Sequence, residues 1–336
     1  MTRSDRFGID RRRLIQGAGL ALGASAAGLA PSAGPARAQG TRNTDTVRLG
    51  WGRGGLPLIA RERGELEKSL AAQDIKVKWV GPFPNHAPSL QAVVGGSADF
   101  GFWGSTTPAL AAIIAGSPLV FTNYNVYSPR STAIIVKKTS GIDSVKDLAG
   151  KKVAVNRSGL GEFLLVAALE KHGVDRKSVE FVYLNPPDAS PAFGQGRVDA
   201  WSMWTPAVDI ARDQYGAKDI FFEGRDLDFL IDYSSLVTLR DFATRNSALV
   251  RAVIDAYARE GRWISENPVE AETIAQKEGK YGDAVRDHLA GYRRQNRFYE
   301  ADDAAFLADF QKAADWLADR AILPQRVRVA DHSVRV

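Results

Sequence analysis

The sequence predicts an α/β protein with two similar lobes, each built on a parallel-rich sheet, and two extended strands that cross between them. Short strands alternate with helices over residues 45–239, which is typical of parallel sheets. The stretch 96–108 recurs at 196–206, and both copies run Gly-x-x-Asp, a short apolar strand, a Trp and then Thr-Pro. A repeated strand-to-helix turn of this kind indicates two related lobes with a ligand site between them, since open α/β sheets bind ligands at the carboxyl ends of their strands.

Three strand–loop–helix units are expected in the first copy of this plan. The expected strands are 47–51, 75–80 and 99–103, and the expected helices are 57–70, 89–94 and 108–115. The stretches 52–55 and 81–88 are rich in Gly and Pro and predict loops. Because these two loops follow strand ends, we expect them to face the ligand site.

The second copy repeats the plan and is joined to the first by two extended segments. The expected strands are 151–155, 179–184 and 199–204, with helices over 162–171, up to 194 and from 206. The segments 132–136 and 234–239 lead into and out of this copy, and the chain after Phe242 is expected to be helical to about Arg320. The predicted first lobe is therefore 45–132 with 240–336, and the predicted second lobe is 133–239.

The amino terminus has the pattern of an export signal. Arg11, Arg12 and Arg13 precede an uncharged run over 14–30, and Ala-Arg-Ala at 36–38 supplies small residues before Gln39. We expect a cleaved twin-arginine-type signal peptide over 1–38 and a periplasmic location. The alternative is a membrane anchor, but the run is short, weakly apolar and followed by a cleavage site.

Composition excludes several classes of site. Residues 1–38 hold six Arg against two Asp, so the remaining chain has 38 basic and 37 acidic residues and no charge bias toward nucleic acid. The chain has no Cys, which excludes disulfides and thiolate metal sites, and it has no cofactor motif. Neither is there an obvious large apolar interface, so a monomer is expected.

Candidate binding residues lie at the strand ends. Thr is a good N-cap and Pro fits the first position of a helix, so each Thr-Pro pair predicts a helix N-terminus beside a Trp. Such N-termini attract anions, and the glycines near 159 would let backbone N–H groups approach a tetrahedral oxyanion. The expected ligand-binding residues are Gly54, Gly55, His86, Trp103, Ser105, Thr106, Ser158, Gly159, Gly161, Glu162, Trp201, Trp204, Thr205 and Tyr233. At least one of the three Trp residues is expected to serve packing alone.

Three segments carry a resemblance to a known family. Residues 95–101, 140–154 and 194–201 are similar to motifs of the periplasmic solute-binding proteins of ABC importers, in the aliphatic sulfonate, taurine and nitrate group. The resemblance implies a two-lobed type II periplasmic-binding-protein fold and a cleft that closes on a small organic anion, with an aliphatic sulfonate favoured. It also implies delivery to an inner-membrane ABC permease with its ATPase, and neither catalysis nor a cofactor.

Other ligands and roles stay open at this point. Relatives often have Trp-Asp-Pro where this chain has Trp204, Thr205 and Pro206, and Thr cannot face an ammonium group as Asp could, although Glu162 could substitute. This departure disfavours taurine but leaves nitrate and aromatic sulfonates as alternatives. An enzyme of pyrimidine-precursor metabolism on the same fold, or a sensory binding protein, are the other readings.

Overall fold

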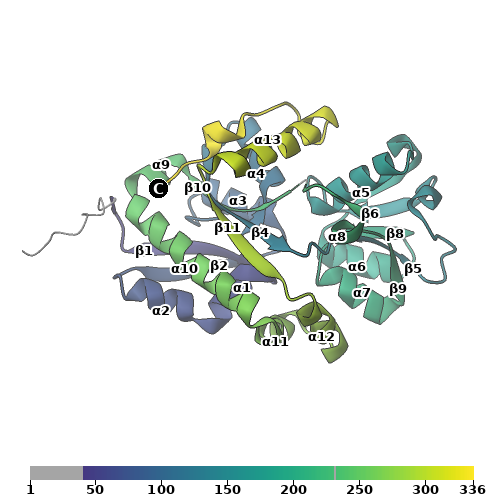
Figure 1. Ribbon diagram of the computed structural model, residues 1–336, viewed down its shortest axis with the longest axis horizontal. Coiled ribbons are helices and arrows are strands. Elements are labelled where there is room, and N and C mark those ends of the chain that lie inside the picture. Colours follow the sequence, from purple (N-terminus) through teal and green to yellow (C-terminus); the bar gives the residue numbers. More distant parts are fainter. Residues whose placement is uncertain (1–40, 231) are drawn as a thin grey trace, which may run out of the picture. The chain divides into compact units, whose positions relative to one another are not determined.

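The computed structural model describes residues 41–230 and 232–336, so the predicted signal peptide and its cleavage site lie outside the described residues. None of the helices over these ranges combines the length and the apolar character that crossing a bilayer requires. The elements form two groups. The first contains a two-stranded and a four-stranded sheet and the second a five-stranded sheet, and Figure 1 shows α5 to α8 gathered about the five-stranded sheet.

The local sequence explains where most helices and strands of the first group begin and end. Its elements are β1 (Thr46–Gly52), α1 (Gly55–Arg63), α2 (Glu65–Ala71), β2 (Lys76–Phe83), α3 (His86–Val94), β3 (Gly104–Ser105), α4 (Thr106–Ile114) and β4 (Leu119–Ser128). The single helix expected over 57–70 is two helices, because Gly64 takes a left-handed conformation with φ 69° and ends the first. The helix expected from 89 begins earlier, at His86, and the strand expected over 99–103 is reduced to bridges made by Phe100.

The second group follows the predicted plan closely. Its elements are β5 (Ala133–Lys137), β6 (Lys152–Val155), α5 (Leu160–Lys171), β7 (Glu180–Tyr183), α6 (Pro186–Gly194), β8 (Ala200–Met203), α7 (Ala207–Tyr215), β9 (Ala217–Phe222) and α8 (Glu223–Asp226). Strands β6, β7 and β8 pair in parallel, as strands joined by helical crossovers do. Strand β9 was not predicted.

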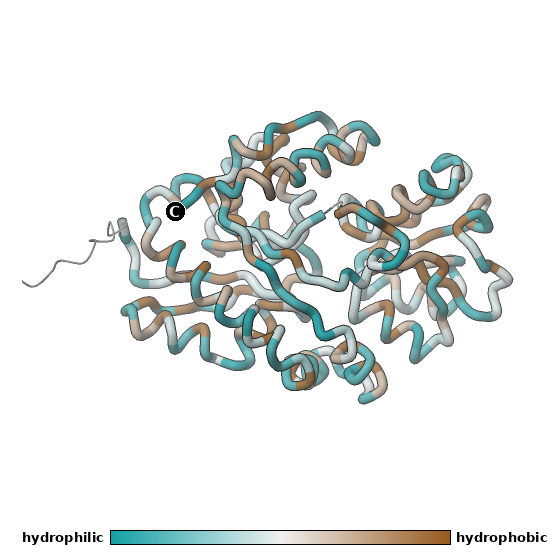
Figure 2. The backbone as a smooth tube through the Cα atoms, in the orientation of Figure 1, coloured by the Kyte–Doolittle hydropathy of each residue, from teal (hydrophilic) through white to brown (hydrophobic). Residues whose placement is uncertain are grey.

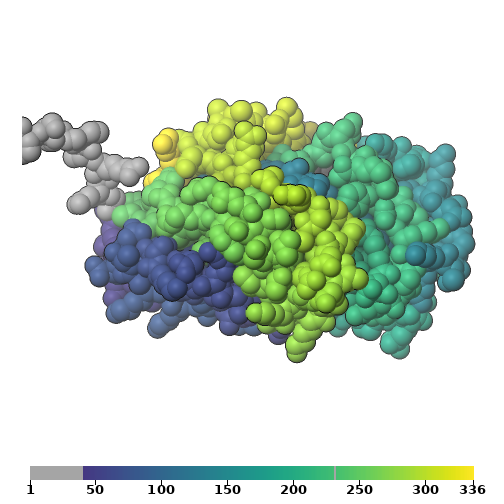
Figure 3. Space-filling model, turned by 60° about the horizontal axis from the view of Figure 1, so that its bottom comes forward, coloured from purple at the N-terminus to yellow at the C-terminus, as the bar shows by residue number. Residues whose placement is uncertain are grey.

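The chain then returns to the first group. Its last elements are β10 (Ser234–Leu239), α9 (Arg240–Arg245), α10 (Ser247–Glu266), α11 (Pro268–Gly279), α12 (Asp283–Gly291), β11 (Gln295–Glu300) and α13 (Ala304–Asp319). Strand β11 corrects the prediction of an all-helical C-terminal region. On the face in Figure 3 these segments, green to yellow, lie against the purple-to-blue N-terminal residues, consistent with contacts of α10 with α1 and α2.

The sheets are mixed, with parallel and antiparallel pairs in each group. The order β7-β6-β8-β5-β9 makes the second sheet, in which β5 is antiparallel to both neighbours. In the first group β1 and β2 are parallel, and the order β11-β4-β10-β3 is antiparallel. The antiparallel strands β4, β5 and β10 flank the two passages between the sheets, where no helical crossover sets strand direction. Strand β10, expected as the exit from the second lobe, lies within the first sheet.

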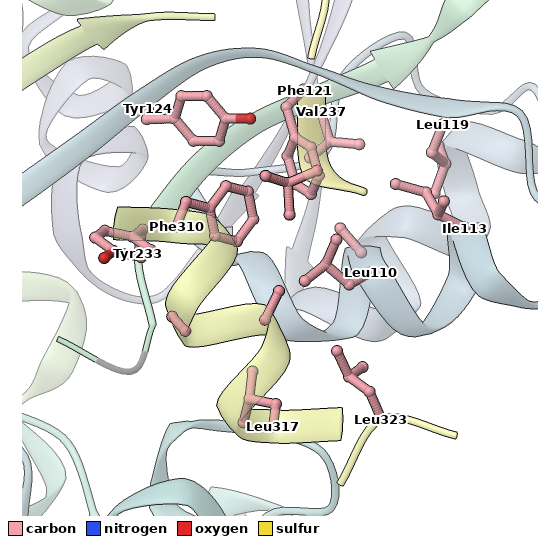
Figure 4. Packing of buried hydrophobic residues seen from close by; sticks show 14 of the residues in the cluster. Leu110, Ile113, Leu119, Phe121, Tyr124, Tyr233, Val237, Phe310, Leu317 and Leu323 are labelled. Carbon is pink, nitrogen blue, oxygen red and sulfur yellow. The ribbon is translucent and has the colours of Figure 1, made fainter. Parts of the chain in front are cut away.

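Apolar packing holds the groups together. Along the surface helices apolar residues alternate with hydrophilic ones, as in α10 (Figure 2). The largest cluster gathers α4, β4, β10 and α13 around residues such as Phe121, Tyr124 and Phe310 (Figure 4). Phe163 of α5 belongs to the same cluster, so the second group packs directly on the first. The Arg320 Nε donates to Glu170 over 2.6 Å beside this contact.

Candidate functional site

A cleft of about 560 Å³ lies where the strand ends of the two sheets face each other. Lining residues come from the loops that precede α1, α3, α4, α5 and α7 and from the first turn of α6. Asn85 Nδ2 donates to Asn185 Oδ1 over 2.9 Å, and these residues precede the equivalent helices α3 and α6 in the two copies. The internal repeat therefore places matching helix N-termini around one cleft.

Three of the six helix N-termini are poor anion sites. Pro186 and Pro187 at the start of α6 and Pro206 before α7 have no N–H to donate. The start of α4 is occupied by the chain's own carboxylate, because Asp232 Oδ1 accepts from the Thr106 N–H at 3.0 Å and from Thr106 Oγ1 at 2.8 Å. Thr106 is thus a capping partner of Asp232 and does not line the cleft, which corrects its predicted ligand contact.

Three helix starts remain: α3, which follows the N-cap Asn85, and the glycine-initiated helices α1 and α5. Gly54 and Gly55 line the cleft at the start of α1, and a Cβ at either would meet no atom within 4 Å. Gly159 lines the cleft as the N-cap of α5, where a Cβ would lie 1.5 Å from Asn156 Nδ2. Both loops bring backbone close to the cleft space, and the positive end of each helix dipole favours an anion there.

The cationic residues of the cleft differ in how far their charge is neutralised. Arg53 pairs with Glu278, and the buried Arg130 donates its Nε to Glu223 Oε1 over 3.0 Å. Arg157 is exposed and stacks on the ring of Tyr183.

Arg294 is half-buried and has neutral partners: its Nη2 donates to Ser131 Oγ at 2.6 Å and to Thr205 Oγ1 at 2.8 Å. Over the described residues, no carboxylate lies within ion-pair distance of Arg294. Arg294 therefore has no ion-pair partner among the described residues, and its charge acts at longer range on the carboxyls of Glu272 and Asp209.

The acidic residues of the cleft are Asp232 and Glu272, and burial raises the pKa of both carboxyls. The Arg130 charge and the hydrogen bonds from Thr106 oppose the shift of Asp232. Arg294 and the Tyr281 hydroxyl oppose that of Glu272. The cleft thus combines two glycine-initiated helix starts, a guanidinium with no ion-pair partner among the described residues and two buried carboxyl groups.

Nine of the fourteen predicted site residues line the cleft. These are Gly54, Gly55, His86, Trp103, Ser105, Gly159, Trp204, Thr205 and Tyr233. The other five are Thr106, Ser158, Gly161, Glu162 and Trp201, which lie behind the lining.

The reasons for these five differences are structural. Trp201 is fully buried on β8 against Phe193, since the strand alternation turns it toward the helices, and only the strand end reaches the cleft. A Cβ on Gly161 would lie 2.3 Å from the Ser202 carbonyl oxygen, so this glycine allows α5 to pack on β8. The Ser158 N–H donates to Glu162 Oε2 over 2.7 Å, and Glu162 also accepts from Tyr183. Glu162 therefore stabilises the loop and cannot face a ligand amine.

The predicted N-caps are also wrong. Ser105 is the N-cap of α4 and Pro206 that of α7, so neither Thr-Pro pair begins a helix as expected. The Thr205 hydroxyl is taken by Ser131 and Arg294 instead.

Sequence reasoning missed several lining residues that come from the passages between the sheets and from the C-terminal region. They are Asn125, Tyr127, Arg130, Asp232, Glu272, Arg294 and Asn296. No local motif marks them, since each reaches the cleft only through long-range pairing.

His86 is buried in the wall of the cleft. Its Nδ1 lies 2.8 Å from the Ser105 carbonyl oxygen, its ring tilts against Phe102, and a Cβ on Gly104 would collide with it. Burial lowers the pKa of His86 to about 4, against the opposing effect of the Ser105 hydrogen bond. The imidazole is therefore neutral at physiological pH.

This shift predicts an acid-sensitive stability. The unfolded chain takes up a proton on His86 below about pH 6.5, whereas the folded protein does so only near pH 4, so stability falls as the pH drops through this interval. We expect a loss of about 3 kcal/mol. Urea unfolding at pH 7 and pH 4.5 should show a larger decrease for the wild type than for His86→Asn. An equal decrease in both would contradict the assignment.

The comparisons with known proteins agree with this architecture. The NMT1/THI5-like family profile matches residues 70–271. The crystal structure of the periplasmic aliphatic sulphonate binding protein SsuA from Escherichia coli is 26% identical, with a TM-score of 0.75 over 88% of this chain and 94% of that one. The alkanesulfonate-binding protein SsuA from Xanthomonas axonopodis pv. citri, bound to MOPS, is 24% identical, with a TM-score of 0.79 over 87% and 99%.

A shorter match links the chain to a taurine-binding periplasmic protein of Escherichia coli (strain K12), 34% identical over 127 residues, which are 38% of this chain and 39% of that protein. Together the matches show that the fold is the two-lobed type II periplasmic-binding-protein fold expected from the sequence.

Proposed function

The chain belongs to the NMT1/THI5-like family, and from this membership and the cleft we propose that it is the substrate-binding component of an ABC importer for an organic sulfonate. It binds the ligand between its lobes in the periplasm and delivers it to the permease. Export uses the signal peptide at 1–38, and the protein acts as a monomer. The lobes are 45–132 with 240–336, and 133–239, and the strand β10 that ends the second range pairs in the sheet of the first lobe.

One observation carries the proposal: the cleft joins an anion-attracting end to an apolar wall. Gly159 and Leu160 at the start of α5 line one part of it, with Arg157 beside them. Trp103, Trp204 and Phe102 line it as well. A sulfonate has the matching division, because a hydrated oxyanion joins an apolar carbon skeleton. The names of the relatives favour the same ligand class.

A direct test is isothermal titration of the purified protein with methanesulfonate, longer alkanesulfonates, benzenesulfonate, taurine, nitrate and sulfate. We expect alkanesulfonates to bind with micromolar or better affinity and inorganic anions at least tenfold more weakly, because the inorganic anions lack the carbon skeleton that the aromatic wall buries. Binding of nitrate alone would favour the nitrate alternative. Absence of binding by every sulfonate would reject the proposal.

The observations favour a binding protein over an enzyme. The solved structure similar over 88% of this chain and the taurine-binding relative are both named as binding proteins. Asp232 and Glu272, the acidic residues of the cleft, have structural partners in Thr106 and Tyr281. Turnover of a bound sulfonate or pyrimidine precursor, followed by mass spectrometry, would contradict this assignment.

Thr205→Asp tests the free charge of Arg294. A carboxylate at position 205 lies within hydrogen-bonding reach of Arg294 Nη2 and cancels its charge, so affinity for alkanesulfonates should fall roughly 10-fold or more. Taurine should lose less, because its ammonium group can face the new carboxylate. Titration calorimetry measures both ligands.

The matched control for this change is Thr205→Asn, which has the shape of Asp without its charge. We expect it to reduce affinity by less than Thr205→Asp. Equal effects of the two substitutions on alkanesulfonate and taurine would show that Arg294 does not act on the ligand.

A further inference from the structure

The first lobe presents a polar wall to the cleft that the proposed sulfonate head does not use. In the register of the antiparallel sheet, Ser234 of β10 is opposite Ser105 of β3 on one side and Asn125 of β4 on the other. Residues directly opposite each other on adjacent strands point to the same face. Ser105, Ser234 and Asn125 all line the cleft, so they form one row of polar side chains along it.

This row continues into a contiguous wall. Asn125 Nδ2 donates to Asn296 Oδ1 over 2.9 Å, and Asn125 is opposite Phe298 on β11. The ring of Trp103 packs edge-on against Phe298 with centroids 5.4 Å apart. Asn296 and Trp103 both line the cleft. Four strands thus bring Ser105, Ser234, Asn125 and Asn296 together, with Trp103 just before β3. We call these five residues the polar wall.

Three atoms of the polar wall are buried without partners. Trp103 Nε1, Ser105 Oγ and Asn125 Oδ1 are enclosed and make no hydrogen bond to any described residue, and the Nε of the neighbouring Arg294 is in the same condition. Trp103 is 7% exposed and Asn125 3%. Leaving such groups unpaired costs about 1–3 kcal/mol each, so native proteins supply them with partners. Asn123 Oδ1 is also buried without a partner but lies away from the cleft, whereas Trp103, Ser105 and Asn125 border it, so a ligand in the cleft can supply their partners.

The hydrogen-bonding chemistry of the unpaired atoms indicates which chemical group of a ligand can pair with them. Trp103 Nε1–H only donates, whereas Asn125 Oδ1 only accepts. An ammonium group cannot accept from Trp103, and it would lie near the positive Arg294. A second carboxylate cannot donate to Asn125, and it would share the cleft with Asp232 and Glu272. A hydroxyl group both donates and accepts without carrying charge, and the serines of the row can bond to it in either sense.

We infer that the polar wall is a second subsite that binds hydroxyl groups on the carbon skeleton of the ligand, so that this protein's preferred ligands are hydroxylated sulfonates. The inference rests on the proposed function, since it takes the sulfonate head to lie at the start of α5. The cleft volume of about 560 Å³ leaves space for a skeleton with several carbons beyond the sulfonate. Aromatic rings such as Trp103 and Trp204 can pack on its C–H groups while the polar wall bonds its oxygens.

Matched ligand pairs test the inference by titration calorimetry of the purified protein. The pairs are 2-hydroxyethanesulfonate with ethanesulfonate, and 2,3-dihydroxypropane-1-sulfonate with propane-1-sulfonate. We expect the hydroxylated member to bind roughly 10-fold more tightly in each pair, the gain of one well-placed hydrogen bond. Equal affinities within the pairs would overturn the inference and leave the proposed function intact. Failure of all four to bind would reject both.

Variants assign the preference to the polar wall. Asn125→Leu removes the acceptor, and Trp103→Phe keeps an aromatic ring without the N–H. In either variant the affinity ratio within each pair should fall toward one. The matched control is Asn123→Leu on the same strand, since Asn123 is equally buried but does not line the cleft. It should retain the wild-type ratio.

Circular dichroism establishes whether each variant is folded. If Asn125→Leu does not fold, Trp103→Phe alone tests the role of the polar wall. A wild-type ratio in folded Trp103→Phe and Asn125→Leu would show that the preference arises elsewhere and would overturn the assignment.

Discussion

Gly159→Val should abolish sulfonate binding, with a loss of roughly 100-fold or more in affinity. A Cβ at this position would lie 1.5 Å from Asn156 Nδ2, so any side chain must displace Asn156. Asn156 Oδ1 accepts from the Gly161 N–H at 3.3 Å and so helps to shape the start of α5. The substitution therefore keeps the ligand away from the backbone and disturbs the loop that presents the N–H groups. Two or more charge-assisted hydrogen bonds between these N–H groups and the sulfonate are then lost.

Calorimetry with propane-1-sulfonate measures the loss, and a thermal melt checks folding. The control is Gly282→Val: Gly282 is likewise the extended N-cap of a helix, α12, but a Cβ there meets no atom within 4 Å and the residue does not line the cleft. It should bind as the wild type does. By contrast with the sequence-based expectation, Ser158→Ala should have little effect, since its side chain does not line the cleft. Retained binding by Gly159→Val would remove the α5 start from the site.

Arg130→Met should lower the free energy of unfolding by about 3–5 kcal/mol, because it leaves the Glu223 carboxylate buried without its partner. Arg130 is 6% exposed and Glu223 2%, and their atoms lie 3.0 Å apart. Arg130 precedes β5 on the passage into the second sheet, and Glu223 begins α8 just after β9 of that sheet. The pair therefore fixes the connection between the lobes as well as the core beside it.

Urea unfolding at pH 7 measures this effect. The control is Arg225→Met, which removes an Arg that also pairs with acidic residues but is 59% exposed, and it should change stability by less than about 1 kcal/mol. Combining Arg130→Met with Glu223→Leu should recover much of the loss, since neither charge then stays buried alone. A loss for Arg130→Met no larger than that for Arg225→Met would show that the pair contributes little.

Site residues could be predicted where their position follows from the local sequence, and not where it depends on long-range strand pairing. The strand-end loops were predictable because a loop's position follows from the alternation of strands and helices. Of the nine predicted residues that line the cleft, eight do so through those loops, and Tyr233 does so from the passage before β10. Trp201 and Trp204 looked equivalent in the sequence, yet only Trp204 lines the cleft, because Trp201 lies within β8 and Trp204 just after it. The direction of a side chain at a strand end depends on the residue at which the strand stops. The local pattern of apolar residues does not define that residue.

By itself the sequence determined the strand–helix units, the internal repeat and the edge of the sheets at which a cleft forms, since these follow from the periodicity of apolar residues and from turn residues. Only the tertiary structure decided which helix N-termini are open and which charges are free. Asp232 reaches Thr106 across 126 residues and Glu223 reaches Arg130 across 93. The tertiary structure also determined that β4, β9 and β11 are strands, and it formed the polar wall on β3, β10, β4 and β11. Such contacts depend on antiparallel pairing between segments far apart in the chain, and no local motif encodes their partners.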